Sequence, residues 1–192
     1  LNCQPIEINH LKGKLAVAHN GNLSNAYVLR SKLELGGAIF HTTSDTEIIA
    51  YTITQERLSS GSIEEAVLKA MDRLDGAYSL CLMSARKLIA VRDKYGFRPL
   101  CYGKTPQGAY VVASESCALS AVGAEMIAEL EPGELIVFDE DGLHHDRRHC
   151  KRAKESFCIF EYMYFSRPDS VIGGMPVHRS REIAGELLAQ TC

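Results

Sequence analysis

The sequence predicts an α+β fold in which helices and mainly antiparallel strands occupy different parts of the chain. Three observations predict it. Two helix-start signatures lie close together in the first third of the chain. Several short apolar segments, separated by turn residues, follow from residue 77 onward. Helices are missing between most of these segments, although a parallel sheet needs a crossover helix between nearly every strand pair.

The beginning of the chain is expected to form a strand, a tight turn and a helix. Residues 14–18 are mostly apolar and run into His19-Asn20-Gly21-Asn22, where Asn-Gly favours a turn. Residues 25–35 carry apolar side chains at helical spacing, and Gly36-Gly37 ends the pattern. The first strand should therefore end at residue 18.

Two capping boxes predict the next two helices. In residues 44–47 and 62–65, a serine is followed three positions later by a glutamate, directly before an apolar run. The serine can accept a hydrogen bond from the N–H three residues on, and the glutamate can reach back to the serine. These boxes predict helices over residues 45–57 and 63–74.

The second half of the chain is typical of short strands. Apolar or alternating segments between turns predict strands over residues 77–83, 88–91, 100–103, 109–113, 127–130 and 135–138. A short helix is expected over residues 117–122. The last two strands flank Glu131-Pro132-Gly133-Glu134, which predicts that they form a hairpin.

A change of composition near residue 145 predicts a domain boundary. The chain becomes polar and basic there, so residues 1–150 are expected to form one domain. Residues 151–192 are expected to hold a linker and the first elements of a second domain. They include an apolar, aromatic run over residues 157–165 and an amphipathic helix over residues 180–190.

Composition excludes several classes of function. The 192 residues are 46% hydrophobic and 23% charged, with a formal net charge of -3. The densest basic run, residues 147–154, lacks interleaved aromatic residues, so it indicates a solvated linker rather than a phosphate-binding patch, and no nucleic acid is expected as a partner. No apolar stretch reaches the length of a membrane span, so no membrane partner is expected. Seven scattered cysteines without a CxxC pair favour free thiols in a reducing cytoplasm.

The segment His19-Asn20-Gly21-Asn22-Leu23 carries candidate catalytic groups. An Asn20 side-chain amide and a Gly21 N–H can donate to the same point, and these are the donors that an oxyanion hole needs in acyl transfer. Glycine also lets the backbone come close to a ligand. Taken alone, Asn-Gly is more often a simple turn.

Asp45 is a candidate substrate-binding residue. An acidic residue in the first turn of a helix complements the helix dipole, and that structural role is the more common one. The alternative is a carboxylate that binds the ammonium group of an amino acid. Because Glu47 is expected to fill the capping role, Asp45 is free to point elsewhere.

Five segments together resemble the class II glutamine amidotransferases, which are N-terminal-nucleophile hydrolases. They are HNGNL at residues 19–23, TTSDTE at residues 42–47, DKYGFRPL at residues 93–100, VVASESCA at residues 111–118 and EYMYFSRPDS at residues 161–170. The resemblance covers nearly the whole chain. It implies two stacked, mainly antiparallel sheets between helix layers (αββα).

The last segment is similar to the branch of this family that acts on phosphoribosyl pyrophosphate. The resemblance implies a parent enzyme that hydrolyses glutamine and transfers ammonia to phosphoribosyl pyrophosphate, giving 5-phosphoribosylamine for purine biosynthesis. It implies that Asn20 and Gly21 form the oxyanion hole and that Asp45 binds the glutamine ammonium. It further implies a homo-oligomer and Mg²⁺ at a site outside this chain. Arg98 is interpreted as a structural organiser.

The chain departs from the family at its start. The family nucleophile is an N-terminal cysteine whose free amine is the base. This chain begins with Leu1, and the nitrogen of Cys3 lies in a peptide bond. The nucleophile and the arginine for the glutamine carboxylate are expected before Leu1, and the phosphoribosyl pyrophosphate site beyond residue 192. We therefore expect an N-terminally incomplete domain that is inactive by itself, exposes apolar surface and tends to associate.

Three questions stay open from the sequence. In part of the family, a cysteine at the position of Cys158 ligates a [4Fe–4S] cluster, and a buried thiol is the alternative. His144, His145 and His149 indicate a polar surface rather than a zinc site. The parent could also be another class II amidotransferase, such as the enzyme that makes glucosamine 6-phosphate, or a non-catalytic module on the same scaffold.

Overall fold

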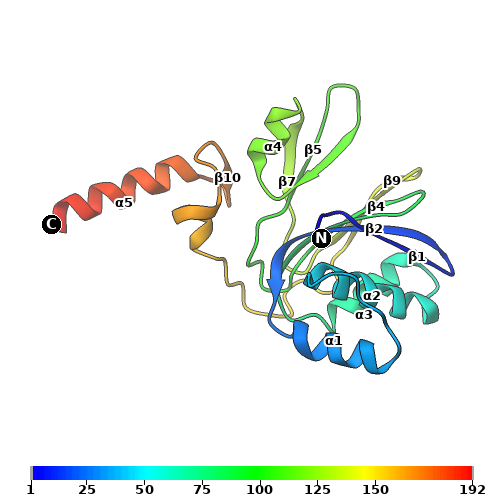
Figure 1. Ribbon diagram of the computed structural model, residues 1–192. Coiled ribbons are helices and arrows are strands. Elements are labelled where there is room, and N and C mark those ends of the chain that lie inside the picture. Colours follow the sequence, from blue (N-terminus) through cyan, green and yellow to red (C-terminus); the bar gives the residue numbers. More distant parts are fainter. Residues whose placement is uncertain (1, 192) are drawn as a thin grey trace.

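Two antiparallel sheets lie face to face in the middle of the molecule, with helices on their outer faces (Figure 1). The computed structural model describes residues 2–191. Leu1, where the chain is expected to begin inside a longer protein, and Cys192, one of the seven cysteines, lie outside the described residues. The helix, sheet, sheet and helix layers confirm the expected α+β (αββα) fold.

The larger sheet has six strands in the order β1-β2-β3-β4-β8-β9, all antiparallel to their neighbours. They are β1 (Ile6–His10), β2 (Gly13–Leu23), β3 (Gly76–Met83), β4 (Leu88–Arg92), β8 (Leu135–Asp139) and β9 (Gly142–Asp146). The smaller sheet has the order β6-β5-β7. Its strands are β5 (Cys101–Lys104), β6 (Tyr110–Ala113) and β7 (Glu125–Glu129).

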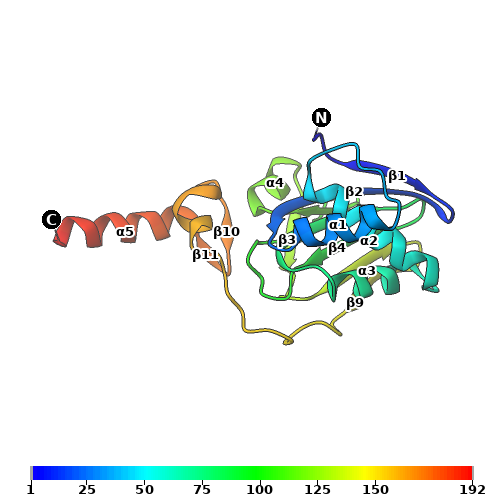
Figure 2. The same ribbon diagram turned by 60° about the horizontal axis from the view of Figure 1, so that its bottom comes forward.

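The helices are α1 (Ala26–Leu35), α2 (Asp45–Ser59), α3 (Ile63–Met71), α4 (Ser116–Ala121) and α5 (Val177–Thr191). The first three cover the outer face of the larger sheet, and α4 covers the smaller one (Figures 1 and 2). Three apolar cores hold these layers together. The largest lies between the six strands and α1–α3, a second between the two sheets, and a third under α4.

The first predicted strand was too short. The structure continues β2 through Asn20 and Gly21 to Leu23, paired with β3, so the expected tight turn at Asn-Gly is wrong. Gly21 takes a φ of 149°, which lets an extended backbone stay in register where another residue would be strained. The candidate catalytic residues therefore lie on a strand, not in a loop.

The hairpin predicted around residues 131–134 is also wrong. Both strands form close to their expected positions, but β7 pairs with β5 in the smaller sheet and β8 pairs with β4 and β9 in the larger one. The Pro-Gly segment is a crossover between the two sheets. A turn sequence favours a reversal of the chain, but it does not decide which strands pair.

The two capping boxes behave differently. Ser62 accepts a hydrogen bond from the Glu65 N–H, as predicted. Ser44 instead accepts from the Thr46 N–H, and the buried Glu47 carboxylate binds the backbone of residues 41 and 42. Glu47 thus fixes the loop before α2 rather than capping the helix.

The basic run after β9 is mostly exposed, as expected for a solvated segment, although several of its side chains pair with the body of the molecule. The expectation of a surface position is wrong for His149, which is buried: its ring and the Arg152 guanidinium each lie 2.8 Å from an oxygen of Asp72. Arg148 pairs with Asp146 and reaches Glu65. These carboxylates offset part of the positive charge of the run, while Lys151 and Lys154 form no ion pair with a described residue.

The C-terminal part forms an arm that extends away from the sheets (Figure 2). It consists of a π-helical turn η1 (Glu161–Phe165), a small hairpin of β10 (Val171–Ile172) and β11 (Met175–Pro176), and α5. No helix within residues 2–191 is both long enough and apolar enough to cross a membrane.

Candidate active site

The outer edge of β2 is open at its C-terminal end. Strand β1 pairs with β2 only as far as Val17. Beyond it, the Gln4 side chain bridges the backbone of His19, accepting from its N–H at 2.5 Å and donating to its carbonyl at 3.0 Å. From residue 20 onward, no strand within residues 2–191 pairs with this edge. A ligand can therefore reach the backbone there.

The strand pairing turns the Gly21 N–H toward this open edge. On β3, the residue opposite Gly21 is Tyr78, and both backbone groups of Tyr78 bond to Asp93 on the far side, at 3.4 and 2.9 Å. In an antiparallel ladder, the N–H and C=O of one residue point the same way, so Gly21 and Tyr78 are a non-hydrogen-bonded pair. The Gly21 N–H is thus available to an acceptor outside the sheet.

Asp45 lies on the same strand edge. Its Oδ2 accepts a hydrogen bond from the Leu23 N–H at 2.9 Å, and its Oδ1 lies 3.4 Å from His19 Nδ1. Because residues 21 and 23 are two apart on a strand, roughly 7 Å separates the Gly21 N–H from the N–H that Asp45 binds. The edge thus carries a backbone donor and a carboxylate within one small ligand's length.

The Asp45 carboxylate is held in its charged form. Burial pushes the pKa of Asp45 upward, but the His19 ring and the Leu23 N–H outweigh burial, so the pKa lies below its ordinary value. Its side chain keeps 19% exposure. An ionised, partly accessible carboxylate can bind a cation from solvent.

Asn20 faces a cavity between the two sheets. Side chains alternate along a strand, so Asn20 points away from His19, which is turned toward the helices. The cavity has a volume of about 440 Å³ and is bounded by β2, β3, β6 and α4. Ser79, Cys81 and Arg167 are among its other lining residues. Burial raises the pKa of the Cys81 thiol, so it is not an activated nucleophile.

The structure thus brings Asn20, Gly21 and Asp45 to one end of β2. Asn20 is exposed, and Gly21 and Asp45 are half-buried. Asp45 does not line the cavity that Asn20 faces, because α2 approaches β2 from the other face of the sheet. The open strand edge is the part of the molecule that all three residues share.

Asp93 is a site-supporting residue that the sequence analysis placed in the DKYGFRPL segment without giving it a role. It is fully buried and accepts hydrogen bonds from the N–H groups of Tyr95, Phe97 and Tyr78. Neighbouring Arg92 is also buried and donates to three backbone carbonyls. An acidic residue directly after an apolar strand was the available signal, but its partners are distant in the sequence.

Arg98 and Cys158 lie where the arm leaves the body. Arg98 forms an ion pair with the buried Glu161 at 2.6 Å, which fits its interpretation as an organiser. Cys158 is half-buried, and its N–H donates to the Phe97 carbonyl. Within residues 2–191, no three His, Cys, Asp or Glu side chains gather into a group that could hold a metal. A cluster at Cys158 would therefore need its other ligands from outside these residues.

Comparisons with known proteins show what this chain is similar to. A family profile described as "Glutamine amidotransferase domain" matches residues 2–121. A relative from Arabidopsis thaliana, amidophosphoribosyltransferase 1, is 43% identical over 190 residues, and one from Bacillus subtilis, amidophosphoribosyltransferase, is 42% identical over 190 residues. Both alignments cover 98% of this chain, but only 33% and 39% of those relatives. The chain thus spans between a third and two fifths of their length.

The fold comparison gives the same result. The B. subtilis glutamine phosphoribosylpyrophosphate amidotransferase, solved with ADP and GMP, superposes with a TM-score of 0.92 at 41% identity, covering all of this chain and 41% of that one. A protein from Silicibacter pomeroyi, described as a glutamine aminotransferase class-II domain protein, shares the fold alone, with a TM-score of 0.53 and 17% identity. This chain belongs to the glutamine amidotransferase domain family and has its N-terminal-nucleophile hydrolase fold.

Proposed function

We propose that this chain is the glutamine-binding part of an amidophosphoribosyltransferase. The parent enzyme hydrolyses glutamine and transfers the ammonia to phosphoribosyl pyrophosphate, giving 5-phosphoribosylamine for purine biosynthesis. One observation carries the proposal. A free Gly21 N–H and the Asp45 carboxylate share one open strand edge, at the spacing of the two ends of a small amino acid.

Each group has a defined role in this proposal. The Gly21 N–H and the Asn20 amide donate to the amide oxygen of glutamine as it becomes an oxyanion. Asp45 binds the α-ammonium group, and its lowered pKa keeps it charged for that task. The nucleophile is a cysteine with a free α-amino group, supplied from outside these 192 residues, because an internal cysteine carries no such amine.

The second half of the reaction rests on the named relatives alone. Two of them, from A. thaliana and B. subtilis, carry the name amidophosphoribosyltransferase and align with this chain over 98% of its length. The site for phosphoribosyl pyrophosphate and Mg²⁺ then lies outside this chain, in a homo-oligomeric parent. Free cysteines at six described positions support a reducing, cytoplasmic setting.

Cys158 stays a candidate ligand of a [4Fe–4S] cluster. Its half-buried position at the base of the arm supports this role, because three further thiolates could approach it from a second domain. Iron and acid-labile sulfide measured in the intact protein, with Cys158→Ser as the comparison, test it. Iron-free protein with full activity overturns the cluster.

Glutamine hydrolysis by the intact protein tests the first half-reaction. Asn20→Ala should lower kcat by about 10²–10³-fold, because one oxyanion donor is lost. Asp45→Asn should instead raise KM for glutamine by at least about tenfold, because one charge-assisted contact is lost.

Ammonia supplied directly is the control. With ammonia in place of glutamine, both variants should release pyrophosphate from phosphoribosyl pyrophosphate at the wild-type rate. Normal glutamine hydrolysis by Asn20→Ala would refute the oxyanion role. A parent protein that releases no pyrophosphate with either nitrogen source would refute the transfer half.

A further inference from the structure

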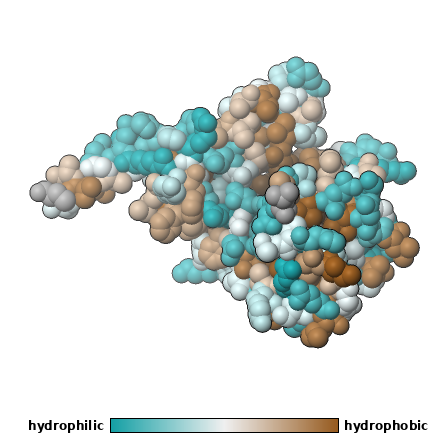
Figure 3. Space-filling model, in the orientation of Figure 1, coloured by the Kyte–Doolittle hydropathy of each residue, from teal (hydrophilic) through white to brown (hydrophobic). Residues whose placement is uncertain are grey.

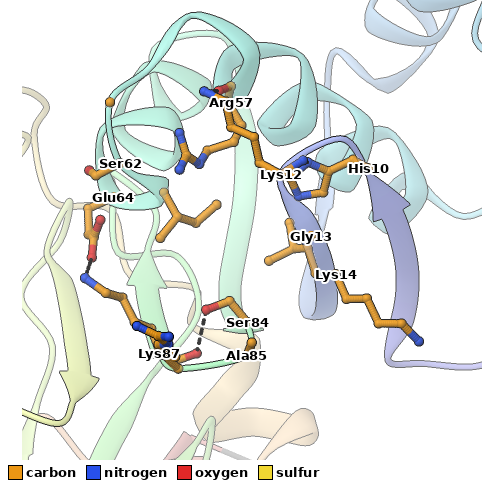
Figure 4. A pocket seen from close by; sticks show the side chains of 14 residues that line it. His10, Lys12, Gly13, Lys14, Arg57, Ser62, Glu64, Ser84, Ala85 and Lys87 are labelled. Carbon is orange, nitrogen blue, oxygen red and sulfur yellow. Dashed lines mark hydrogen bonds and ion pairs between the residues drawn. The ribbon is translucent and has the colours of Figure 1, made fainter.

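A second cavity lies at the other end of β2. It has a volume of about 360 Å³ and is enclosed by four segments: the β1–β2 hairpin, the end of α2, the start of α3 and the β3–β4 hairpin (Figure 4). Lys14 and Gly21 are seven positions apart along β2, which corresponds to a distance of roughly 23 Å. None of the residues assigned above to glutamine lines this cavity.

The cavity is strongly basic in a chain whose net charge is -3. Its lining carries five cationic side chains, Lys12, Lys14, Arg57, Arg86 and Lys87, and a single acidic one, Glu64. Lys14 pairs with Glu7, and Lys87 pairs with Glu64 and Asp139. Among the described residues, Lys12, Arg57 and Arg86 have no carboxylate within ion-pair distance. Three positive charges are therefore uncompensated around one cavity.

Two of these cations are held in place by backbone carbonyls. The Lys12 ammonium donates to the Arg57 carbonyl at 2.9 Å and to the Ser60 carbonyl at 3.2 Å, and the Arg57 guanidinium donates to the same Ser60 carbonyl at 2.6 Å. Both groups are thereby fixed beside the cavity (Figure 4). Neutral carbonyls leave their charge intact, and each cation keeps further N–H donors for an anion.

The surroundings add to the positive potential. The nine-residue helix α3 directs its N-terminus into the cavity wall, where Ser62 caps it. The pKa of His10 is lowered by its burial and further by Arg57 and Lys12.

The cavity floor is apolar. Leu15 is 1% exposed, and the partly buried Ile63 packs against the same core. A basic rim above an apolar floor suits a ligand with one anionic group and one apolar face. The volume also lies within the range of small-molecule sites.

We propose that this cavity binds a small phosphorylated molecule, with its phosphoryl group at Lys12, Arg57 and Arg86 and its apolar body over Ile63, above the buried Leu15. Several arginine and lysine side chains together favour phosphate over an anion of lower charge. A guanidinium group can also donate to two phosphate oxygens at once. In the basic run of residues 147–152, by contrast, Arg147, Arg148 and Arg152 are each paired with a carboxylate.

Calorimetry on the intact protein at low salt, with phenyl phosphate and inorganic phosphate as probes, tests the proposal. Phenyl phosphate should bind more tightly than inorganic phosphate, because it also covers the apolar floor. Arg86→Gln should weaken phenyl phosphate binding by about tenfold, because one charge-assisted contact is lost. Arg86 makes no ion pair in the structure, so this variant should keep the fold.

The matched control is Lys32→Gln. Lys32 is exposed on α1 and does not line the cavity, so this variant should bind the probes like the wild type. Hydrogen exchange locates the probe, since the amides of residues 61–64 and 84–87 should exchange more slowly when it is bound. Unchanged affinity in Arg86→Gln, or unchanged exchange in both segments, overturns the site. Equal affinity for the two probes overturns the role of the apolar floor.

Discussion

At the scale of single residues, Gly21 meets two requirements at once. Its φ of 149° is unfavourable for a residue with a side chain, and a Cβ there would collide with the Ala77 carbonyl on β3. The same conformation keeps β2 paired while its N–H faces the open edge. Glycine is therefore required by the fold as well as by the proposed oxyanion hole.

Gly21→Ala should lower the free energy of unfolding by at least about 2 kcal/mol, because it adds a backbone collision to an unfavourable φ. Urea unfolding measures this. Gly13→Ala is a matched control, because Gly13 also has a positive φ, 118°, but open space around its Cβ position. The control should cost only about 1 kcal/mol. Equal losses in the two variants would show that the Ala77 contact is unimportant.

At the scale of elements, the contact between β2 and α2 joins the two halves of the candidate site. Asp45 opens α2 and binds the Leu23 N–H at the end of β2, and His19 lies between them. The lowered pKa of Asp45 makes this contact dependent on pH. Since the folded state favours the charged form, the stabilisation is present above the unfolded pKa, about 3.9, and is lost as the pH falls through the folded pKa.

Asp45→Asn should therefore destabilise the protein at pH 7, and this effect should shrink as the pH falls below about 3.9, where the carboxyl group of the unfolded wild-type chain takes up a proton first. Unfolding by urea at several pH values measures the difference between the two proteins. A difference that stays constant from pH 7 to pH 3 would contradict the ionised contact with Leu23.

At the scale of the whole molecule, the body and the arm are joined by a few polar contacts. Arg98 pairs with Glu161 at 2.6 Å and also lies over the Phe165 ring, 4.4 Å from its centre. Glu161 further accepts a hydrogen bond from the Ser166 hydroxyl. This buried cluster fixes the start of the arm against the loop that follows Asp93.

The arm exposes apolar surface, at a different place from the incomplete central sheet where the sequence analysis expected it. Apolar side chains gather over η1 and near the outer end of α5 (Figure 3). The exposed ones include Ile159, Phe160, Met163, Tyr164, Leu187 and Leu188. Association through this surface stays a prediction.

A double-mutant cycle on Arg98→Ala and Glu161→Ala should give a coupling energy of about 1–3 kcal/mol, because each change leaves the other charge without its partner. Hydrogen exchange of residues 160–166 should speed up in either single variant. Strictly additive losses of stability would mean that the ion pair does not hold the arm.

The sequence by itself determined the local structure and the family. The spacing of apolar residues predicted α1, and the capping box at residues 62–65 predicted α3, since both signals depend on contacts three and four residues apart. The segments HNGNL and TTSDTE were sufficient to identify the candidate residues Asn20, Gly21 and Asp45. These signals are contained within short stretches of the chain, so they can be read one at a time.

Only the tertiary structure decided which segments meet. It separated β7 from β8, turned Glu47 away from its expected cap and carried β2 through Asn20 and Gly21. It also aimed the Gly21 N–H outward, through Tyr78 and its bonds to Asp93. Strand partners and buried carboxylates depend on contacts between residues far apart in the chain, and a turn or capping signature carries no information about those partners.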